Sequence, residues 1–270
     1  NKLIFNKWRD AVGGNMKYIF SGAAALQPRL ARVFTAAQMP IYEGYGLSET
    51  SPVISVNSTE PKGKCYGTVG KVIAGVEVKF GDDGEILCKG HNVMMGYYNK
   101  PELTNEVIDK DGWFSTGDIG EMVEGVYLKI TDRKKEIFKT SGGKYIAPQV
   151  MENKFKESRI IEQIMVVGEN EKMPSAFIVP EFEALKVWCK LHNLDYTTNA
   201  EMSQHPIVLE KFQSEINHYN KQFAPFEHVK KFAVMKETWS IDGGELTATL
   251  KLKRKPIMGK YQKIYQEIYS

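Results

Sequence analysis

Two short stretches hold the residue types best suited to chemistry on an anionic ligand. The first, at residues 44–50, reads GYGLSET and joins an aromatic ring, a hydroxyl and a carboxylate around two glycines. The second runs from Gly117 to Pro148 and contains Asp118, the charged run DRKKE, an SGG turn and a proline that can start a helix. A carboxylate beyond a glycine at an expected strand end, as at Asp118, can accept hydrogen bonds from both ribose hydroxyls of a nucleotide.

Neither stretch fits the common nucleotide-binding fingerprints. GYGLSET lacks the third glycine of the dinucleotide motif, and SGGK is not a Walker loop because Tyr145, rather than serine or threonine, follows Lys144. Simpler interpretations stay open for both stretches. The first can be a loop with two turn glycines, and the second can hold a turn aspartate at Asp118 and a solvated charge run at residues 132–136.

The elements that must position these residues can be read from hydrophobic patterning. Residues 17–34 predict a short strand, a small-residue turn and a helix entered near Pro28. Residues 39–50 predict a buried strand that ends in a glycine-broken loop, and ligands collect beyond strand ends in open α/β sheets. Residues 66–130 carry two hairpin signals, VEVKF-GDDG-EILCK and EMV-EG-VYLKI.

After Asp132 short strands alternate with helical stretches, which is typical of a compact α+β domain. The predicted fold class is therefore a multidomain α/β and α+β protein. We expect part of a large α/β nucleotide-binding domain at 1–65, a β-rich subdomain at 66–131 and an α+β domain at 132–270.

Bulk properties exclude several classes of protein. The chain has 270 residues with 36 basic and 33 acidic side chains, and a net charge of +3 is too small to indicate nucleic-acid binding, although KLKRK at 251–255 is locally basic. Three cysteines without CxxC spacing predict buried thiols in a reducing compartment. No apolar run is long enough to cross a bilayer, which favours a cytoplasmic protein. The chain starts at Asn1 without a methionine, so we expect it to be part of a longer protein.

These motifs resemble the adenylate-forming superfamily, which includes acyl-CoA synthetases, peptide synthetase adenylation domains and luciferases. The resemblance implies that Tyr45 stacks on adenine, that the Ser48 hydroxyl meets phosphate and that Glu49 holds Mg²⁺. Stacking on a purine and a single carboxylate for Mg²⁺ both suit these residue types. It also implies that the turn SGAAALQP lines the adenine and acyl pocket, so the nucleotide-binding residues would be Gly22, Ala23, Tyr45, Gly46, Ser48, Asp118 and Arg133.

The same resemblance assigns roles in the C-terminal half. Lys135 would be the hinge about which the mobile C-terminal domain swings, and Gly142 and Gly143 would line the path of the CoA pantetheine. Lys251 would be the catalytic lysine that bridges carboxylate and phosphate. Thr249 and Leu250 stand where the general pattern has serine and glycine, a departure that long-chain acyl-CoA synthetases share.

The implied reaction is ATP-dependent activation of a fatty acid to an acyl-adenylate, followed by transfer to CoA, with Mg²⁺, ATP and CoA required. An adenylating enzyme that loads a carrier protein, and a nucleotide- or CoA-binding module without catalysis, stay open. The resemblance covers only the C-terminal half of a typical member, so we expect no acyl-adenylate from this chain alone; measurable ATP–pyrophosphate exchange would contradict this. The sequence leaves acyl chain length, oligomeric state and peripheral membrane association open.

Overall fold

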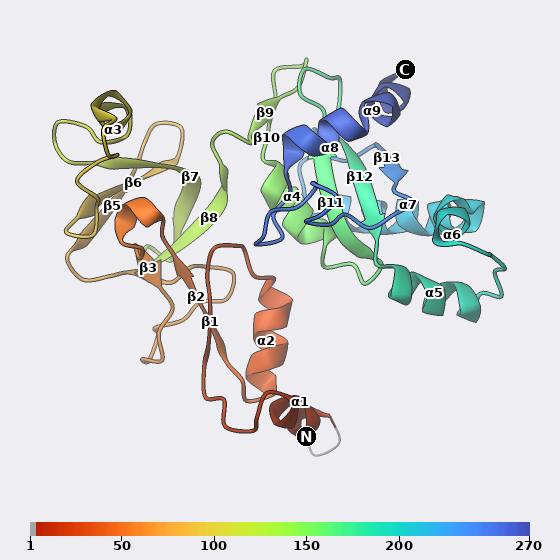
Figure 1. Cartoon of the computed structure of the whole chain (residues 1–270), viewed down its shortest axis with the longest axis horizontal. Coiled ribbons are helices and arrows are strands. Elements are labelled where there is room, and N and C mark those ends of the chain that lie inside the picture. The colour runs from red at the N-terminus through yellow and green to blue at the C-terminus, as the bar shows by residue number, and fades with distance from the viewer. Residues whose placement is uncertain (1–3) are drawn as a thin grey trace. The chain divides into compact units, whose positions relative to one another are not determined.

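A computed structural model describes residues 4–270 of the chain. It divides into two compact units, of which the first ends at Lys134 and the second begins at Lys135 (Figure 1). We call them the N-terminal unit and the C-terminal unit. The predicted three-part division after residues 65 and 131 stays a prediction.

The first sheet of the N-terminal unit has four strands in the order β1-β2-β3-β4. Strands β1 and β2 are parallel, and the other pairs are antiparallel. Helix α2 begins at Pro28, a residue preorganised for the first helical turn, and packs against β2. The strand, turn and helix predicted for residues 17–34 are confirmed. The bounds are α1 (Phe5–Ala11), β1 (Ile19–Ser21), α2 (Pro28–Ala36), β2 (Ile41–Tyr45), β3 (Ser55–Val56) and β4 (Lys71–Val72).

The second sheet of this unit is an antiparallel meander in the order β5-β6-β7-β8. Both predicted hairpins are present, as β5–β6 and β7–β8. A shared apolar cluster that includes Tyr45, Ile54, Phe114 and Leu128 joins this sheet to the first. The bounds are β5 (Val76–Phe80), β6 (Glu85–Gly90), α3 (Pro101–Val107), β7 (Phe114–Val123) and β8 (Tyr127–Arg133).

The predicted position of Asp118 at a strand end is wrong. Strand β7 runs from Phe114 to Val123, so Asp118 lies in its middle. Gly117 takes a positive φ of 73°, and the pairing of β6 with β7 shifts register between Glu85 and Leu87. A glycine at positive φ is typical of a bulge, so the glycine bends the strand without ending it.

The C-terminal unit is a three-stranded sheet covered on both faces. Its order is β11-β12-β13, with an antiparallel and then a parallel pair. Helices α4, α5, α6 and α7 cover one face, and α8 and α9 cover the other (Figure 1). The bounds are β9 (Phe138–Lys139), β10 (Tyr145–Ile146), α4 (Pro148–Phe155), β11 (Ile161–Val167), β12 (Ser175–Pro180), α5 (Phe182–Leu191), α6 (Asn199–Gln204), α7 (Pro206–Asn220), β13 (Lys231–Val234), α8 (Arg254–Lys260) and α9 (Gln262–Tyr269).

Alternation along β11 and β12 explains this three-layer arrangement. Ile164 and Ile178 face the cluster under α4 to α7, while Met165 and Phe177 face the cluster under α8 and α9. Successive side chains of a strand point to opposite faces. A strand that is apolar at every position must therefore be covered on both sides, as continuous runs such as SAFIVP require.

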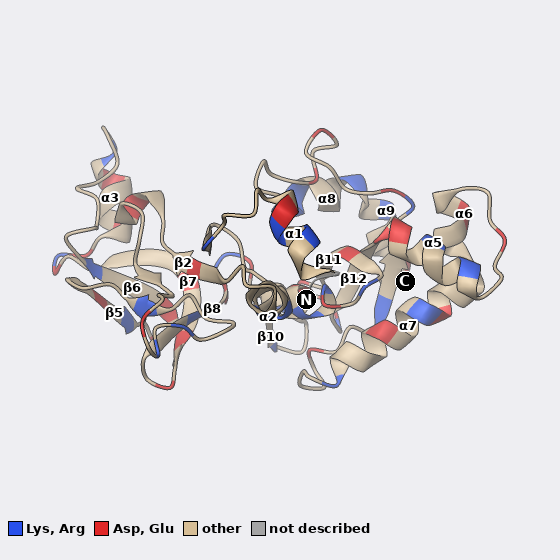
Figure 2. Cartoon of the chain, turned by 90° about the horizontal axis from the view of Figure 1, so that it is seen from below, with Lys and Arg blue, Asp and Glu red and all other residues tan. Residues whose placement is uncertain are grey.

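Three further properties bear on the expectations from sequence. Cys88 and Cys189 are buried free thiols, as predicted, but Cys65 is only half-buried. Basic and acidic residues are interspersed along the ribbons of each unit (Figure 2). Within residues 4–270, the helices fall short of the length and apolar character that a membrane span demands.

Candidate nucleotide-binding site

The two chemically distinctive motifs of the N-terminal unit meet at one hydrogen bond. The hydroxyl of Tyr45, at the end of β2, donates to Oδ2 of Asp118 in β7 at 2.7 Å. Both residues are buried, with exposed fractions of 9% and 6%. Burial, and then the neighbouring charge of Asp118, raise the pKa of the Tyr45 hydroxyl, so it stays protonated and donates.

The bulge in β7 fixes the direction of Asp118. The Thr116 hydroxyl donates to the Ile86 carbonyl at 2.7 Å and accepts from the Asp118 amide at 3.1 Å. On the neighbouring strand, Nε of Arg133 lies 3.5 Å from Oδ1 of Asp118. One carboxylate oxygen therefore faces tyrosine and the other faces guanidinium, and Arg133, about half exposed, remains accessible to a ligand.

Glu49 lies four residues after Tyr45, so the Cα atoms of the two residues can be at most about 14 Å apart. It lies in a single 3₁₀ turn at Ser48–Thr50. The buried Thr50 hydroxyl holds this turn, because it accepts from the Leu47 amide at 2.9 Å and donates to the Pro52 carbonyl at 3.0 Å. Ser48 is exposed on the turn and Glu49 is half-buried. The two carboxylates thus belong to one compact region of the N-terminal unit.

The donor set around Glu49 fits a magnesium ion that keeps most of its waters. Within residues 4–270, no cluster of three or more His, Cys, Asp or Glu side chains could hold a metal by itself. Mg²⁺ is commonly bound by one or two carboxylates together with substrate phosphates and water. A single partly exposed carboxylate at Glu49 matches that mode, in which nucleotide oxygens complete the shell.

Gly46 is required by packing as well as by any ligand. A Cβ at this position would lie 1.6 Å from the Pro52 carbonyl oxygen, far inside contact distance. The chain between Tyr45 and Glu49 can therefore take this path only with glycine. Packing alone is enough to require glycine at this position.

The small-residue turn after β1 borders the same strand. Gly22 and Ala23 are exposed, and Ala23 takes a positive φ of 65°. A Cβ on Gly22 would sit 3.5 Å from the Gly44 carbonyl oxygen, which is ordinary contact. This turn therefore leaves backbone open to a ligand beside β2.

Sequence reasoning missed a buried carboxylate under that turn. Glu43, on β2, is 8% exposed and pairs in register with Ser21 of β1. Burial raises its pKa to about 7, against opposing effects from a hydrogen bond with the Leu26 backbone and from the Lys64 charge. An acidic residue at an inward-facing position of a predicted buried strand was the signal that could have revealed it.

In the C-terminal unit, the predicted CoA residues lie on an exposed turn between β9 and β10. Thr140 closes the turn, since its amide donates to the Lys144 carbonyl at 2.9 Å and its carbonyl accepts from the Gly143 amide at 2.9 Å. Gly143 has a φ of 79°, whereas a Cβ on Gly142 would meet only the Thr140 hydroxyl, at 4.0 Å. The turn presents bare backbone to solvent, as a close approach by a thin ligand would need.

Lys251 lies on a second tight turn in the same unit. The Thr247 amide donates to the Lys251 carbonyl at 2.8 Å, and the Lys251 amide donates to the Thr247 hydroxyl at 3.0 Å. Leu250 closes the turn with a φ of 59°, in the left-handed region that favours glycine. Leu250 therefore keeps the backbone conformation that glycine would adopt at this position. Lys251, at the end of the turn, is half-buried.

Arg254 ties this turn to the core of the C-terminal unit. Its Nη2 lies 2.7 Å and 2.8 Å from the two oxygens of Glu152, and its Nε donates to Glu136 at 2.9 Å. Glu152 also accepts from the Val166 amide at 2.7 Å. Nη1 of Arg254 donates to the Val166 carbonyl at 3.1 Å, so this one side chain connects α8, α4, β11 and the segment that opens the unit.

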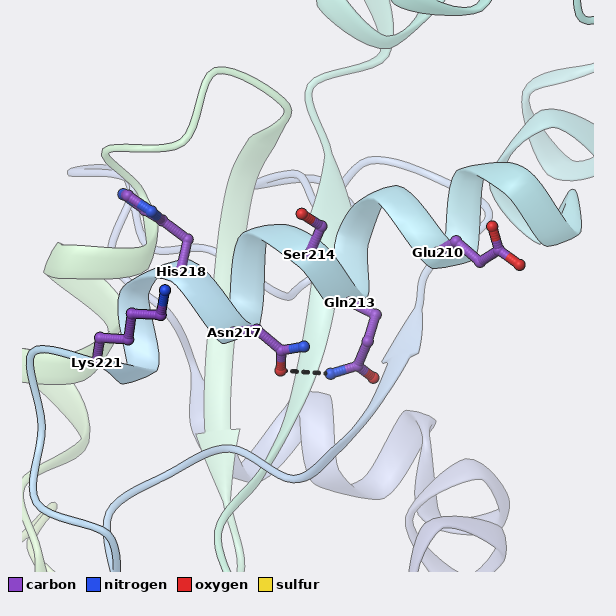
Figure 3. Close-up of a pocket in the computed structure, with 6 residues that line it drawn as sticks. All are labelled: Glu210, Gln213, Ser214, Asn217, His218 and Lys221. Carbon is purple, nitrogen blue, oxygen red and sulfur yellow. Dashed lines mark hydrogen bonds between the residues drawn. The ribbon is translucent and has the colours of Figure 1, made fainter.

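A hollow of about 460 Å³ lies elsewhere, along α7 (Figure 3). The side chains that line it come from one helix, and Gln213 donates to Asn217 at 2.9 Å within it. A surface made by a single helix cannot surround a ligand, and no predicted site residue borders this hollow. The lining residues are Glu210, Gln213, Ser214, Asn217, His218 and Lys221.

The fold is that of adenylation domains. The adenylation domain of the carboxylate reductase of Mycobacterium chelonae matches 98% of this chain with a TM-score of 0.75 at 22% identity, over 40% of its own length. The corresponding domain of Segniliparus rugosus, solved with AMP and a co-purified carboxylic acid, matches 99% with a TM-score of 0.76 at 23% identity, over 42% of its length. At this level of identity the likeness shows the fold alone.

Sequence comparison then gives the family. Residues 3–98 match the AMP-binding enzyme family, and residues 135–270 match the AMP-binding enzyme C-terminal domain. The chain belongs to the AMP-binding enzymes.

Individual relatives match along the whole chain. A long-chain-fatty-acid–CoA ligase of Mycobacterium tuberculosis is 35% identical over 271 residues, which is 100% of this chain and 45% of that protein. Long-chain-fatty-acid–CoA ligase 5 of Rattus norvegicus is 35% identical over 285 residues, or 41% of its length. Fatty acyl-CoA synthetase A of Dictyostelium discoideum is 34% identical over 290 residues, or 43% of its length. The chain spans less than half the length of these relatives.

Proposed function

We propose that this chain is the part of a long-chain-fatty-acid–CoA ligase that holds AMP and carries the mobile catalytic lysine. The reaction is the activation of a fatty acid with ATP and its transfer to CoA. The observation that carries the proposal is the Tyr45–Asp118 hydrogen bond, because it joins the two motifs that would grip one nucleotide. The names of the relatives, all ligases of fatty acids at 34–35% identity, support the choice of substrate.

The reaction has two steps. A carboxylate oxygen of the fatty acid attacks the α-phosphorus of ATP, and the bond to the leaving pyrophosphate breaks. The thiol of CoA then attacks the acyl carbon, loses its proton and releases AMP. Neither step needs a protein nucleophile, so catalysis depends on positioning and on neutralising charge.

Each proposed residue acts on one part of the nucleotide. The Tyr45 ring stacks on adenine, while its hydroxyl holds the carboxylate of Asp118. Asp118 accepts hydrogen bonds from the ribose hydroxyls, and Arg133 contacts ribose or phosphate. The Ser48 hydroxyl donates to phosphate, and Glu49 would hold Mg²⁺. Mg²⁺, when bound, would neutralise charge on the phosphate oxygens.

Lys251 acts in the first step and the Gly142–Gly143 turn in the second. Lys251 would offset negative charge at the α-phosphate, a kind of contact whose loss commonly costs about 3 kcal/mol or more. The 141–144 turn would line the path of the CoA pantetheine. Both belong to the C-terminal unit, so a rotation about Lys135 would let each serve the same nucleotide in turn.

Nucleotide binding by the chain itself tests the proposal. Titration calorimetry with AMP should show binding by the wild type and a loss of about tenfold to a hundredfold for Asp118→Asn, because hydrogen bonds to a charged acceptor are among the strongest. Asp111→Asn, at an exposed turn position, is the matched control. Equal AMP affinity for wild type and Asp118→Asn would reject the proposed ribose contact.

One observation favours a second candidate, the loading of a carrier protein. A solved carboxylic acid reductase that matches 99% of this chain at 23% identity with a TM-score of 0.75 is described as an A-PCP didomain. Calorimetry with CoA separates the candidates. Binding of free CoA that is lost in a Gly142→Trp variant favours the CoA ligase, because Gly142 has the space to accept a blocking side chain without a clash.

We also propose a cytoplasmic location with contact at membrane surfaces, since the substrate is an insoluble acid. The three free thiols suit a reducing compartment. Cosedimentation of the protein with vesicles of mixed neutral and anionic lipid tests the membrane contact. Complete recovery in the supernatant at low salt would contradict it.

A further inference from the structure

Glu49 has a protein partner that the motif itself does not contain. The hydroxyl of Tyr97 donates to Oε1 of Glu49 at 2.9 Å, across 48 positions of sequence. The segments that carry these two residues are also joined through the backbone, because the Met94 amide donates to the Glu49 carbonyl at 2.8 Å. The segment 94–100, between β6 and α3, thus holds Glu49 at its backbone and at its carboxylate.

A further contact fixes the backbone of Tyr97. Its amide donates to the Thr104 hydroxyl at 2.9 Å, and that hydroxyl donates to the Lys100 carbonyl at 3.0 Å. Gly96 allows the approach, since a Cβ there would lie 2.8 Å from the Thr104 methyl carbon. Tyr97 therefore lies on a turn whose backbone is hydrogen-bonded to helix α3.

We propose that Tyr97 is a positioning residue, which fixes the rotation of the Glu49 carboxylate so that Oε2 faces the metal. This rests on the proposed role of Glu49. The carboxylate of a glutamate without such a partner can rotate about its terminal torsion, whose preferred angles are broad and weakly restrained. A hydrogen bond at Oε1 removes that freedom and leaves the other oxygen for a ligand. Mg²⁺ demands near-octahedral geometry, so a preset oxygen lowers the cost of binding.

The neighbouring Tyr98 offers a matched control. It is 90% exposed, whereas Tyr97 is half-buried with its hydroxyl on Glu49. Tyr97→Phe and Tyr98→Phe each remove one oxygen from adjacent rings. Only the first change frees the carboxylate of Glu49.

The test is the affinity of the whole chain for ATP, measured by calorimetry with Mg²⁺ and with EDTA in its place. We expect Tyr97→Phe to weaken ATP binding in Mg²⁺ about threefold to tenfold, the range for one hydrogen bond, and to leave binding in EDTA unchanged. Tyr98→Phe should change neither affinity. Thr104→Val should act like Tyr97→Phe, and Thr104→Ser, which keeps the hydroxyl, should behave as wild type.

The outcomes separate this inference from the proposed function. If Mg²⁺ does not alter the ATP affinity of the wild type, Glu49 holds no metal and both ideas fail. If Glu49→Gln abolishes the effect of Mg²⁺ while Tyr97→Phe and Thr104→Val retain it in full, the role of Glu49 stands and that of Tyr97 is overturned.

Two other results would also overturn it. Equal weakening in Mg²⁺ and in EDTA would mean that Tyr97 only supports the local fold. Tighter binding of ATP in Mg²⁺ by Tyr97→Phe would mean that the hydroxyl competes with the metal. Should Tyr97→Phe unfold at the assay temperature, the comparison of Thr104→Val with Thr104→Ser decides by the same criteria.

Discussion

Glu43 is a single buried carboxylate whose ionisation opposes folding. Its pKa of about 7 in the folded chain lies above its ordinary value of 4.5, so folding favours the protonated form. The stability that this residue contributes is complete below about pH 4.5. It is lost progressively as the pH rises through 7, because the unfolded chain can then ionise the group more easily.

Glu43→Gln should therefore remove a pH dependence. Between about pH 5 and pH 8 we expect the free energy of unfolding of the variant to rise by about 2.5 kcal/mol relative to the wild type, since each unit of the pKa shift from 4.5 to about 7 corresponds to about 1.4 kcal/mol. Scanning calorimetry across this range is the measurement. Glu60→Gln, at an exposed position, is the control. Parallel pH profiles for wild type and Glu43→Gln would show that Glu43 is not the cause.

For single residues, the sequence predicts which residue types belong to the site more readily than it predicts which side chains they contact. Tyr45, Glu49 and Asp118 stand out by their motifs, yet the bond between Tyr45 and Asp118 spans 73 positions and that between Tyr97 and Glu49 spans 48. Such pairs follow from how two sheets pack, and no local spacing encodes them. Tyr97 also sits in a run of two tyrosines, so sequence alone could not say which one turns inward.

Elements were predicted well where patterning is strong. The hairpins β5–β6 and β7–β8 have turn residues between alternating strands, and both form as expected. The interior of β7 was not predicted, because glycine followed by aspartate reads as a turn. Gly117 instead takes a positive φ inside a strand whose pairing continues on either side. A bulge and a strand end share the same sequence signal.

Arg254 joins several elements of the C-terminal unit through its side chain. Its partner is the carboxylate of Glu152. Burial raises the pKa of Glu152, and the charge of Arg254 acts against that rise. Arg254→Met should destabilise the unit by about 3–5 kcal/mol, because removing one member of a buried pair leaves the other uncompensated. Hydrogen exchange of the β11 amides in the whole chain measures this locally.

Two further variants make that result specific. Lys263→Met, on the exposed side of α9, is the matched control and should leave β11 protection unchanged. Adding Glu152→Gln to Arg254→Met should recover part of the loss, because the second change removes the unpaired charge. Unchanged exchange in Arg254→Met would contradict the assignment of Arg254 as the anchor of α8 and the Lys251 turn.

For the molecule as a whole, the junction of the two units is flanked by residues that are each held within their own unit. Lys134 donates its amide to the Gly117 carbonyl at 2.9 Å, and its Nζ lies 2.6 Å from Glu85 and 2.7 Å from Asp83. Glu136, on the other side, accepts from Arg254 and from Gln149 at 2.9 and 3.0 Å. Between them, Lys135 is an exposed turn residue. These contacts would confine the proposed torsional change to the junction itself.

A proline at the junction tests whether such a change is needed. Lys135→Pro fixes φ near −65° and restricts the residue before it, so one of the two orientations that alternate in the proposed mechanism should become inaccessible. In the full-length ligase proposed above, we expect either ATP–pyrophosphate exchange or acyl transfer to CoA to fall at least tenfold while the other is retained. Lys135→Ala, which leaves the torsions free, should retain both. Full rates in both half-reactions for Lys135→Pro would mean that the residue is a simple linker, and that a single arrangement of the two units serves both steps.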